Sequence, residues 1–231
     1  MSPQTRLVEV RQNVLKQNDL VARGLRQRFH DAGVCVVSLV SSPGSGKTAF
    51  LEKTLALLRP SRRVAALVGD LATENDAARL ARAQVPVRQI TTGTLCHLEA
   101  AMIQTAIEGW RLNELDFLFI ENVGNLVCPA SFDLGQHRNV TLLSVTEGDD
   151  KPEKYPVIFR ASDLVVLSKA DLLGVLDDFD PARAAAGLRA LGRDTPMIQT
   201  AARRVPVLAP WLSWIEQQLA ERRVAMPAEL A

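Results

Sequence analysis

A glycine-rich segment between an apolar run and a helix-forming run constrains the fold of this chain most strongly. It reads Ser-Ser-Pro-Gly-Ser-Gly-Lys-Thr over residues 41–48, after the apolar run 34–40 and before the run 49–58. In a strand–loop–helix unit, the loop N–H groups gather at a helix N-terminus and can hold a phosphate. The P-loop pattern has glycine where Ser41 stands, so the match lacks its first position. A chance glycine-rich turn is the alternative.

The remaining residues of this segment predict a nucleoside triphosphate site. The Lys47 ammonium would reach the β- and γ-phosphates, and the Thr48 hydroxyl would hold Mg²⁺. Catalysis therefore depends on Lys47. The predicted phosphate-binding residues are Pro43, Gly44, Ser45, Gly46, Lys47, Thr48 and Ala49.

Apolar runs alternate with helical patterns after residue 33, which predicts a P-loop NTPase fold of the α/β class. Such alternation gives a mostly parallel sheet covered on both faces, a three-layer α/β/α sandwich. The predicted strands are 34–40, 64–68, 87–90, 117–120, 140–145, 164–167 and 197–199. The predicted helices after the first strand are 48–58, 74–84, 98–112, 181–191 and 208–223.

The chain is expected to begin with a helical extension over residues 1–32. Apolar residues recur at helical spacing from Leu7 through Val14 to Phe29, with polar residues between them. This pattern predicts a helix over 5–30 that covers part of the sheet. The GTPase domain would then span 33–224, and residues 225–231 would form a frayed tail.

Composition excludes several classes of protein. A chain of 231 residues suits one α/β domain with short appendages. A formal net charge of +1 argues against a dedicated nucleic-acid binder. No apolar stretch is long enough for a membrane span, and the first 15 residues lack a signal-peptide core. Three cysteines do not suit a disulfide framework, so we expect a cytoplasmic protein.

Two predicted strands end in carboxylates that could serve the nucleotide. Glu121 follows the run 117–120 and could hold Mg²⁺ through water, while Gly124 could donate its N–H to the γ-phosphate. Asp70 ends the second strand and is a candidate for Mg²⁺ or for orienting the attacking water. Both acids could instead be ordinary loop residues. Residues 71–76 would form a switch loop, in which Thr73 could equally be a helix N-cap.

The segment Ser168-Lys169-Ala170-Asp171 favours guanine as the base. It departs from Asn-Lys-X-Asp only at Ser168, which lacks the amide. The Asp171 carboxylate can accept from N1–H and the exocyclic amine of guanine, a pair that adenine does not offer. The Lys169 stem would pack along the ring plane. After the last strand, the Ala202 N–H could reach the guanine oxygen.

Cys96, His97 and Cys128 form a candidate metal set. Thiolates and imidazole are ligands of Zn²⁺ and Ni²⁺. We expect Cys96-His97 to open a helix and to meet Cys128, which lies four residues past Gly124. Movement of that loop on hydrolysis would then alter metal affinity. The alternative is two small buried cysteines and a surface histidine, and we expect Cys35 to be a packing residue of the first strand.

Together these motifs resemble the nickel-incorporation GTPase of hydrogenase maturation, which shares a GTPase class with the urease nickel chaperone. The resemblance rests on residues 41–48, 69–70, 75–77, 92–93, 96–98, 121–129, 145–152 and 154–156. It implies a GTP-hydrolysing metallochaperone that delivers nickel to the large subunit of a nickel–iron hydrogenase, with accessory maturation proteins. It also implies dimerisation on GTP binding, nickel or zinc at Cys96, His97 and Cys128, and Lys151 and Lys154 near the partner's nucleotide.

The chain also departs from that family. No cysteine precedes Cys35 and only three histidines are present, so nickel storage is not expected. Residues 204–207 replace the expected Thr-Gly-Glu-Gly, and Asn125 stands where a Gln or His would orient water, which predicts slow intrinsic hydrolysis. The alternatives are a metal-binding adaptor with weakened GTPase activity, a paralogue serving another metalloenzyme, and a cobalamin-loading GTPase chaperone.

Overall fold

The computed structural model describes residues 3–70, 79–80, 82–202 and 208–224, with side chains from residue 12 onward. The predicted switch loop 71–76, the loop 204–207 and the tail 225–231 lie outside the described residues. So does most of the predicted helix 74–84, of which residues 79 and 80 are helical.

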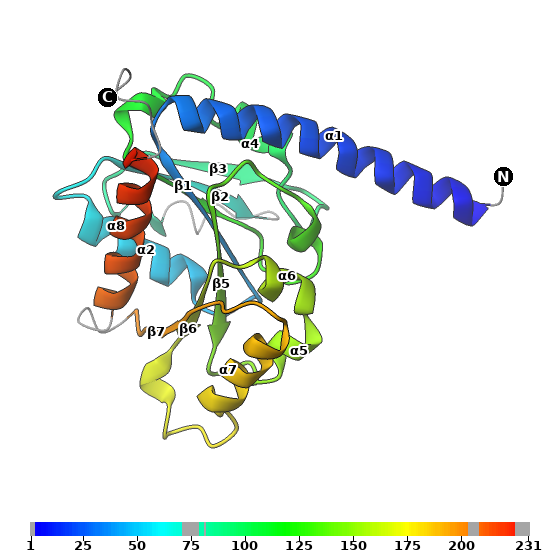
Figure 1. The fold of residues 1–231 in the computed structure, drawn as a ribbon. Helices are drawn as coiled ribbons and strands as arrows, with labels where there is room; N and C mark the ends of the chain where they lie inside the picture. Colours follow the sequence, from blue (N-terminus) through cyan, green and yellow to red (C-terminus); the bar gives the residue numbers. More distant parts are fainter. Residues whose placement is uncertain (1–2, 71–78, 81, 203–207, 225–231) are drawn as a thin grey trace.

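A seven-stranded sheet forms the centre of the molecule (Figure 1). All described strand pairs are parallel, in the order β3-β2-β4-β1-β5-β6-β7. The strands differ from the predicted runs by at most two residues at either end. They are β1 (Cys35–Ser41), β2 (Val64–Asp70), β3 (Val87–Thr91), β4 (Phe117–Glu121), β5 (Arg138–Ser144), β6 (Leu164–Ser168) and β7 (Met197–Gln199).

Helices cover both faces of the sheet, which confirms the predicted three-layer α/β/α fold. They are α1 (Pro3–Asp31), α2 (Lys47–Leu58), α4 (Ala100–Ala106), α5 (Lys151–Lys154), α6 (Pro156–Ala161), α7 (Pro181–Ala190) and α8 (Ala209–Val224). Short 3₁₀ turns are η1 (Leu112–Glu114), η2 (Cys128–Ser131) and η3 (Ala170–Leu172).

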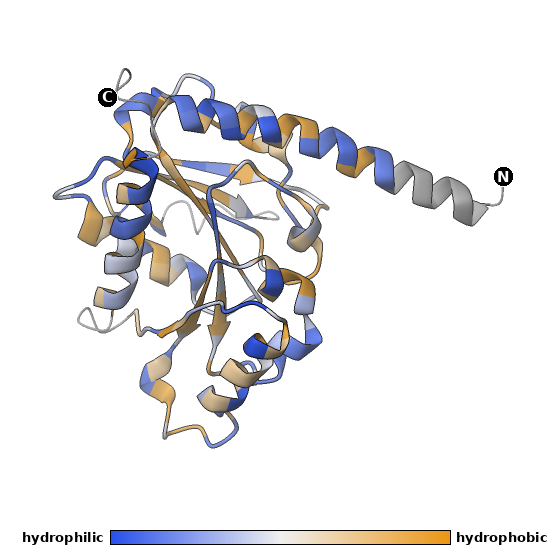
Figure 2. Ribbon diagram, viewed as in Figure 1, coloured by the Kyte–Doolittle hydropathy of each residue, from blue (hydrophilic) through white to orange (hydrophobic). Residues whose placement is uncertain are grey.

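Strand β1 shows how the two faces are divided. Val37 and Leu39 pack with Phe50 of α2 and Trp211 of α8. Val36, one residue out of phase, packs with α1 and α4 on the opposite face. Because successive strand residues point to opposite faces, this fully buried strand supplies both cores. Figure 2 shows the resulting concentration of hydrophobic residues in the central strands.

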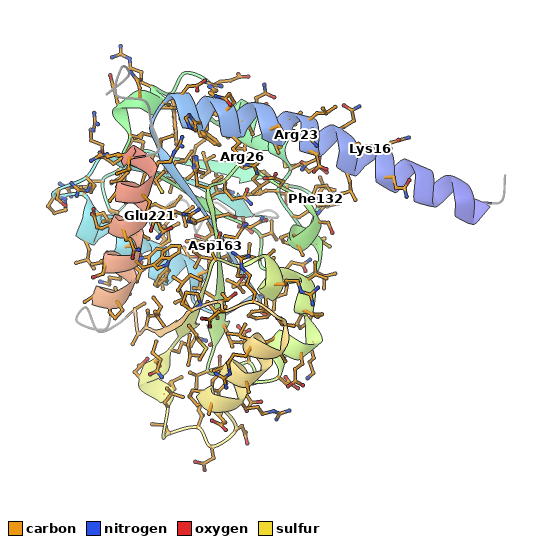
Figure 3. All side chains as sticks on the ribbon, viewed as in Figure 1. Lys16, Arg23, Arg26, Phe132, Asp163 and Glu221 are labelled. Atoms are coloured by element: carbon orange, nitrogen blue, oxygen red, sulfur yellow. The ribbon has the colours of Figure 1, made fainter. Side chains whose placement is uncertain are left out.

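Among the described side chains of helix α1, residues 12–31, the buried ones lie in its second half (Figure 1). Leu25 and Phe29 are buried, whereas Val14, about three helical turns before Leu25 on the same face, is 44% exposed, so the covered part of that face ends before Val14. Figure 3 shows Lys16, Arg23 and Arg26 along this helix. The side chains of residues 3–11 lie outside the described part. The division into an extension and a GTPase domain stays a prediction.

Helix α4 is much shorter than the predicted helix 98–112. It starts at Ala100, because Glu99 is extended (φ −116°, ψ 154°). The N–H groups before it bond to side chains from elsewhere: Leu98 donates to Asn122 and Ala100 to Asn18. Cys96 and His97 therefore lie in a loop rather than at the opening of a helix. Among the described helices, none combines the length and apolar character needed to cross a bilayer.

Candidate nucleotide and metal sites

The P-loop joins β1 to α2. Gly46 caps α2 in the left-handed region (φ 91°), where a side chain would be strained. The Phe50 N–H already bonds to the Gly46 carbonyl, so the preceding N–H groups of the helix start remain for a ligand. This is the arrangement that binds a phosphate at a helix N-terminus.

Lys47, Thr48 and Glu121 converge at the carboxyl edge of the sheet. Thr48 Oγ1 donates to Glu121 Oε1 at 2.7 Å, and Lys47 Nζ lies 3.6 Å from the same oxygen. Glu121 is only 2% exposed. Two oxygens that share an octahedral Mg²⁺ at about 2.1 Å lie about 2.9 Å apart, so the hydroxyl and carboxylate could hold this ion with little movement.

Asp70 reaches the same edge from the neighbouring strand. In the β2–β4 register Val68 lies opposite Glu121, so Asp70 extends two residues beyond that level. Its carbonyl accepts from the Thr92 N–H at 3.0 Å, which joins the end of β2 to the loop after β3. A role of Asp70 at Mg²⁺ stays a prediction.

Gly124 stands directly against the P-loop. A Cβ atom at this position would lie 3.0 Å from the Cα of Pro43. Only glycine permits this close backbone approach without a shift of one loop. The loop after β4 and the phosphate loop are therefore in contact, as a γ-phosphate sensor requires.

A pocket of about 620 Å³ lies beside the P-loop, on the side of β6 and β7. This volume is suited to a small-molecule ligand. Its walls include all the residues predicted to contact the base, together with the start of α2. The lining residues are Ser45, Gly46, Ala49, Phe50, Glu52, Lys53, Arg79, Ser168, Lys169, Asp171, Leu172, Thr200 and Ala202.

Ser168 ties the end of β6 to the P-loop. Its hydroxyl donates to the Ser45 carbonyl at 2.7 Å, and both residues are buried. Lys169, in the left-handed region (φ 56°), donates to the Gly44 carbonyl at 2.9 Å and to Thr146 Oγ1 at 3.0 Å. From the sequence, Ser168 was expected only to lack the amide of the asparagine that it replaces. In the structure its hydroxyl supports the phosphate loop from the base pocket.

Glu147 is a residue near the phosphate site that sequence reasoning missed. Burial raises the pKa of its carboxyl, against the lowering effects of Ser42, Lys151, Lys169 and Lys47. On α5, Lys154 pairs with Asp150 at 2.6 Å, and Lys151 lies over the Tyr155 ring. Both lysines thus have contacts within their own chain, and their role toward a partner's nucleotide stays a prediction.

The structure brings together the three predicted metal donors. Cys96 lies in the loop between β3 and α4, and Cys128 begins η2 after β4. Their sulfur atoms are 2.7 Å apart, His97 Nδ1 lies 3.9 Å from Cys96 Sγ, and all three donor atoms lie within 4.8 Å of one another. The alternative of unrelated buried residues does not account for this convergence.

The surroundings of His97 suit a metal ligand. The ring is 8% exposed and stacks on Phe132 at 3.8 Å. With Nδ1 on the side of Cys96, Nε2 lies 3.4 Å from Glu99 Oε1. A carboxylate at the second ring nitrogen orients a ligating imidazole and raises its basicity. Glu99 and Phe132 were not found from the sequence, because neither belongs to a spacing motif.

The donor set needs to open before it takes an ion. Two sulfurs bound to one tetrahedral ion at about 2.3 Å would lie about 3.8 Å apart, further than the 2.7 Å observed. The two sulfurs must therefore separate by about 1 Å, through rotation of a cysteine side chain or a shift of its loop. Three donors also leave a coordination position for water, a backbone group or a second subunit.

Two asparagines hold the metal loops, and sequence reasoning gave neither of them this role. Asn122 Oδ1 accepts from the Leu98 N–H at 3.1 Å and from the Val123 N–H at 2.9 Å. Asn125 Oδ1 accepts from the N–H groups of Val127 at 2.7 Å and Cys128 at 3.4 Å. An Asn that follows a strand end is a signal for such turn bonds.

Cys35 is separate from this set. It is 1% exposed in β1, and burial raises the pKa of its thiol to about 11. A protonated thiol in a strand core is a packing residue, as predicted.

Comparisons with known proteins identify the family. The model of the CobW/HypB/UreG nucleotide-binding domain matches residues 35–199. The hydrogenase maturation factor HypB of Azotobacter chroococcum mcd 1 is 48% identical over 221 residues, which cover 95% of this chain and 72% of that protein. The chain belongs to the HypB family. HypB of Escherichia coli K12 is 46% identical over 93% of this chain and 74% of its own length.

A solved HypB structure agrees with this assignment. HypB from Helicobacter pylori in complex with nickel superposes with a TM-score of 0.84 and 40% identity, over 89% of this chain and 96% of that one. These comparisons confirm the resemblance inferred from the motifs. The chain is a GTP-binding protein of hydrogenase maturation, as predicted. In this HypB-family chain the candidate nickel donors follow β3 and β4, and the base pocket lies on the other side of the P-loop, toward β6 and β7.

Proposed function

We propose that this chain is a GTP-hydrolysing nickel metallochaperone, which uses nucleotide binding and hydrolysis to control nickel insertion into the large subunit of a nickel–iron hydrogenase. One observation carries the proposal. The strand that supplies Glu121 to the phosphate site continues within seven residues to Cys128, whose sulfur lies 2.7 Å from that of Cys96. A single loop therefore serves both the nucleotide and the metal.

The nucleotide site works by positioning and by electrostatics. The P-loop N–H groups and Lys47 hold the phosphates and stabilise the charge that develops on hydrolysis. Thr48, Glu121 and Asp70 supply the oxygen atoms for Mg²⁺, which neutralises phosphate charge when bound. Asp171 selects guanine, Lys169 covers the base, and the Ala202 N–H contacts the guanine oxygen. Because Asn125 follows Gly124, intrinsic hydrolysis is slow.

The metal site takes its cargo, Ni²⁺ or Zn²⁺, on Cys96, His97 and Cys128. GTP binding promotes a homodimer in which a second subunit completes the coordination, and Lys151 and Lys154 approach the partner's nucleotide. The number of donors supports this, because three ligands in one chain leave a position of a tetrahedral site open. Accessory maturation proteins and the hydrogenase large subunit are the expected partners.

Calorimetric titration with nickel tests the proposal. The protein is loaded with GDP and Mg²⁺, or with a non-hydrolysable GTP analogue and Mg²⁺, and nickel affinity is measured in each state. We expect affinities that differ at least about fivefold, the lower range of allosteric coupling. Equal affinities would contradict the proposal. Nickel binding without any GTP turnover would instead favour a metal-binding adaptor.

A further inference from the structure

We propose that Asn122 is the positioning residue that couples the nucleotide site to the metal site. The inference rests on the proposed function and adds the element through which one site acts on the other. Among the described residues, the hydrogen bonds of the Asn122 side chain go to neither the phosphate residues nor the metal donors. It acts through the two backbone segments that carry them.

The Asn122 side chain holds the two segments with a single oxygen atom. Its Oδ1 accepts from the Leu98 N–H at 3.1 Å and from the Val123 N–H at 2.9 Å. Leu98 directly follows the metal donor His97, and Val123 directly precedes Gly124. A carboxamide oxygen has two lone pairs, so both are used. Displacement of Val123 therefore changes the bond to Leu98.

The nucleotide acts on the residues that flank Asn122 in the chain, Glu121 before it and Gly124 after it. Glu121, the preceding residue, accepts from the Thr48 hydroxyl at 2.7 Å, and the position of this oxygen pair would adjust when Thr48 holds Mg²⁺. Gly124, two residues later, lies against Pro43 of the P-loop. The Asn122 backbone itself is fixed, since its N–H donates to the Leu39 carbonyl of β1 at 3.0 Å. A change at Gly124 is thus felt by the side chain of Asn122 while its main chain stays in the sheet.

Burial makes this link stiff. Asn122 is 2% exposed, Leu98 is fully buried, and Val123 is 6% exposed. Water cannot readily replace either bond, so a lost bond leaves a buried N–H without an acceptor. The two segments consequently move together rather than separately.

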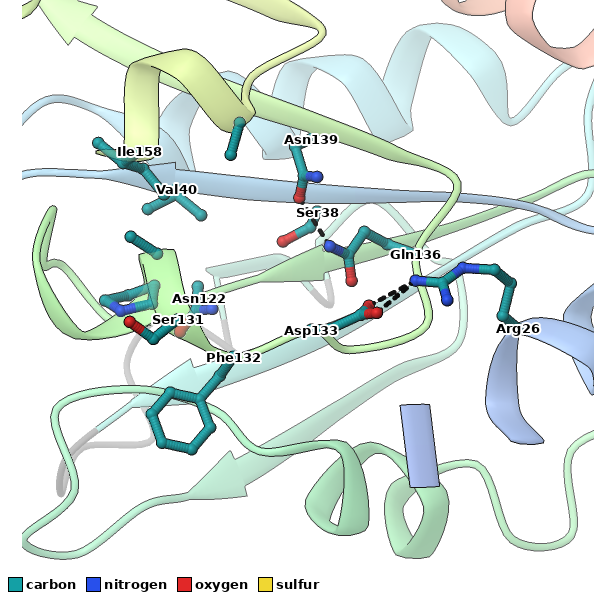
Figure 4. Close-up of a pocket in the computed structure, with 13 residues that line it drawn as sticks. Arg26, Ser38, Val40, Asn122, Ser131, Phe132, Asp133, Gln136, Asn139 and Ile158 are labelled. Carbon is teal, nitrogen blue, oxygen red and sulfur yellow. Dashed lines mark hydrogen bonds and ion pairs between the residues drawn. The ribbon is translucent and has the colours of Figure 1, made fainter. Parts of the chain in front are cut away.

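The segment after Cys128 has room to respond. A cavity of about 270 Å³ separates Asn122 and residues 129–133 from Ser38, Val40 and Ile158 (Figure 4). Close packing would resist a shift of these residues, whereas a cavity permits it. Both metal loops, one bonded to Asn122 and one bordering this cavity, can therefore spread to the separation that an ion needs.

Substitution of Asn122 tests the link. Nickel affinity is measured with GDP and with the non-hydrolysable GTP analogue for wild type, Asn122→Ala, Asn122→Ser and Asn122→Asp. We expect the ratio of the two affinities to fall from at least about fivefold in wild type to within about twofold of unity in the Ala and Ser variants. The Asp variant keeps an acceptor oxygen and should retain the ratio. Melting curves and GDP affinity verify that each variant is folded.

Asn125→Ala is the matched control. It removes an asparagine that holds the turn at Cys128 but has no described bond to the His97 loop. We expect weaker nickel binding in both nucleotide states, with the ratio retained. Folded Ala and Ser variants of Asn122 that keep the wild-type ratio would overturn the role of Asn122 and leave the proposed function intact. A wild-type ratio of one would overturn both.

Discussion

The two edges of the parallel sheet use similar polar residues in opposite ways. At the amino edge, polar side chains bond to the backbone at the start of a neighbouring strand: Asp116 accepts from the Arg63 N–H, Asp163 from the Asn139 N–H, and His137 from the Val36 N–H. At the carboxyl edge, Asn122 and Ser168 also bond to backbone groups, but the residues predicted to bind ligands bond to each other: Thr48 to Glu121, and Cys96 to Cys128.

This difference separates stability from function. A side chain that satisfies a buried N–H is part of the fold, and its loss costs folding free energy. Side chains that bond mainly to each other can exchange those bonds for a ligand or an ion. Ligands of parallel α/β sheets bind at the carboxyl ends of the strands for this reason, among others. The comparison therefore predicts that substitutions at the amino edge lower the stability of the fold. Substitutions at the carboxyl edge should instead reduce metal binding or GTP turnover.

The largest effect is expected from Lys47→Ala at the carboxyl edge. GTP turnover with Mg²⁺, measured as phosphate release, should fall at least about 100-fold because the charge on the phosphates loses its main cation. Lys16→Ala, an exposed lysine of α1, should leave turnover unchanged. Wild-type turnover in Lys47→Ala would mean that the phosphate site is wrongly assigned.

Paired cysteine substitutions compare the two edges with one residue type. Cys96→Ala should weaken nickel binding at least about 100-fold while leaving GDP affinity within about twofold, because it removes a metal donor and no nucleotide contact. Cys35→Ala, in the first strand, should leave nickel affinity unchanged and lower only the melting temperature. Nickel titration measures the affinity of both variants, and thermal unfolding measures their melting temperatures. An equal loss of nickel affinity in the two variants would contradict the difference between the two edges.

Asp116→Ala should produce the reverse pattern. Asp116 is 7% exposed and accepts from the Arg63 N–H at 2.8 Å and from Arg223 at 2.6 Å. Its removal takes away the acceptor of the part-buried bond from the Arg63 N–H and the partner of Arg223, and should lower the free energy of unfolding by about 2 kcal/mol. Chemical denaturation measures the loss, with the exposed Asp177→Ala as a control expected to change it by less than about 0.5 kcal/mol. Loss of GTP turnover without loss of stability would contradict the assignment of this edge.

The smallest effect is a pH dependence from His137. Burial, followed by Arg222 and Arg138, lowers the pKa of this imidazole from 6.5 to about 3. Below pH 6.5 the unfolded chain gains a proton that the folded chain does not, so stability falls as the pH falls toward 3. Between pH 7 and 5.5 this contributes a loss of about 1 kcal/mol. Chemical denaturation at pH 7 and pH 5.5 measures the loss of unfolding free energy, and the part due to His137 should disappear in His137→Asn. An unchanged loss in this variant would contradict the prediction.

The sequence by itself was enough for the strands, the P-loop and three candidate metal donors. Those features are local: apolar runs of strand length, a glycine pattern between a strand and a helix, and residue types whose chemistry matches phosphate, guanine and nickel. Cys96, His97 and Cys128 could be named as candidates because thiolate and imidazole bind nickel and zinc, and because the segments that carry them resemble those of the nickel-incorporation GTPases.

Only the tertiary structure decided how these pieces bond to one another. Helix α4 starts at Ala100, where Asn18 and Asn122, distant in sequence, accept from N–H groups that have no partner within a helix start. The structure gives Ser168 a role that the sequence did not predict. Because β6 ends beside the P-loop, the Ser168 hydroxyl donates to the Ser45 carbonyl. Hydrogen bonds between residues far apart in the chain produce no pattern in the sequence. Burial produces a periodic apolar pattern, and turns require particular residue types, so both can be predicted.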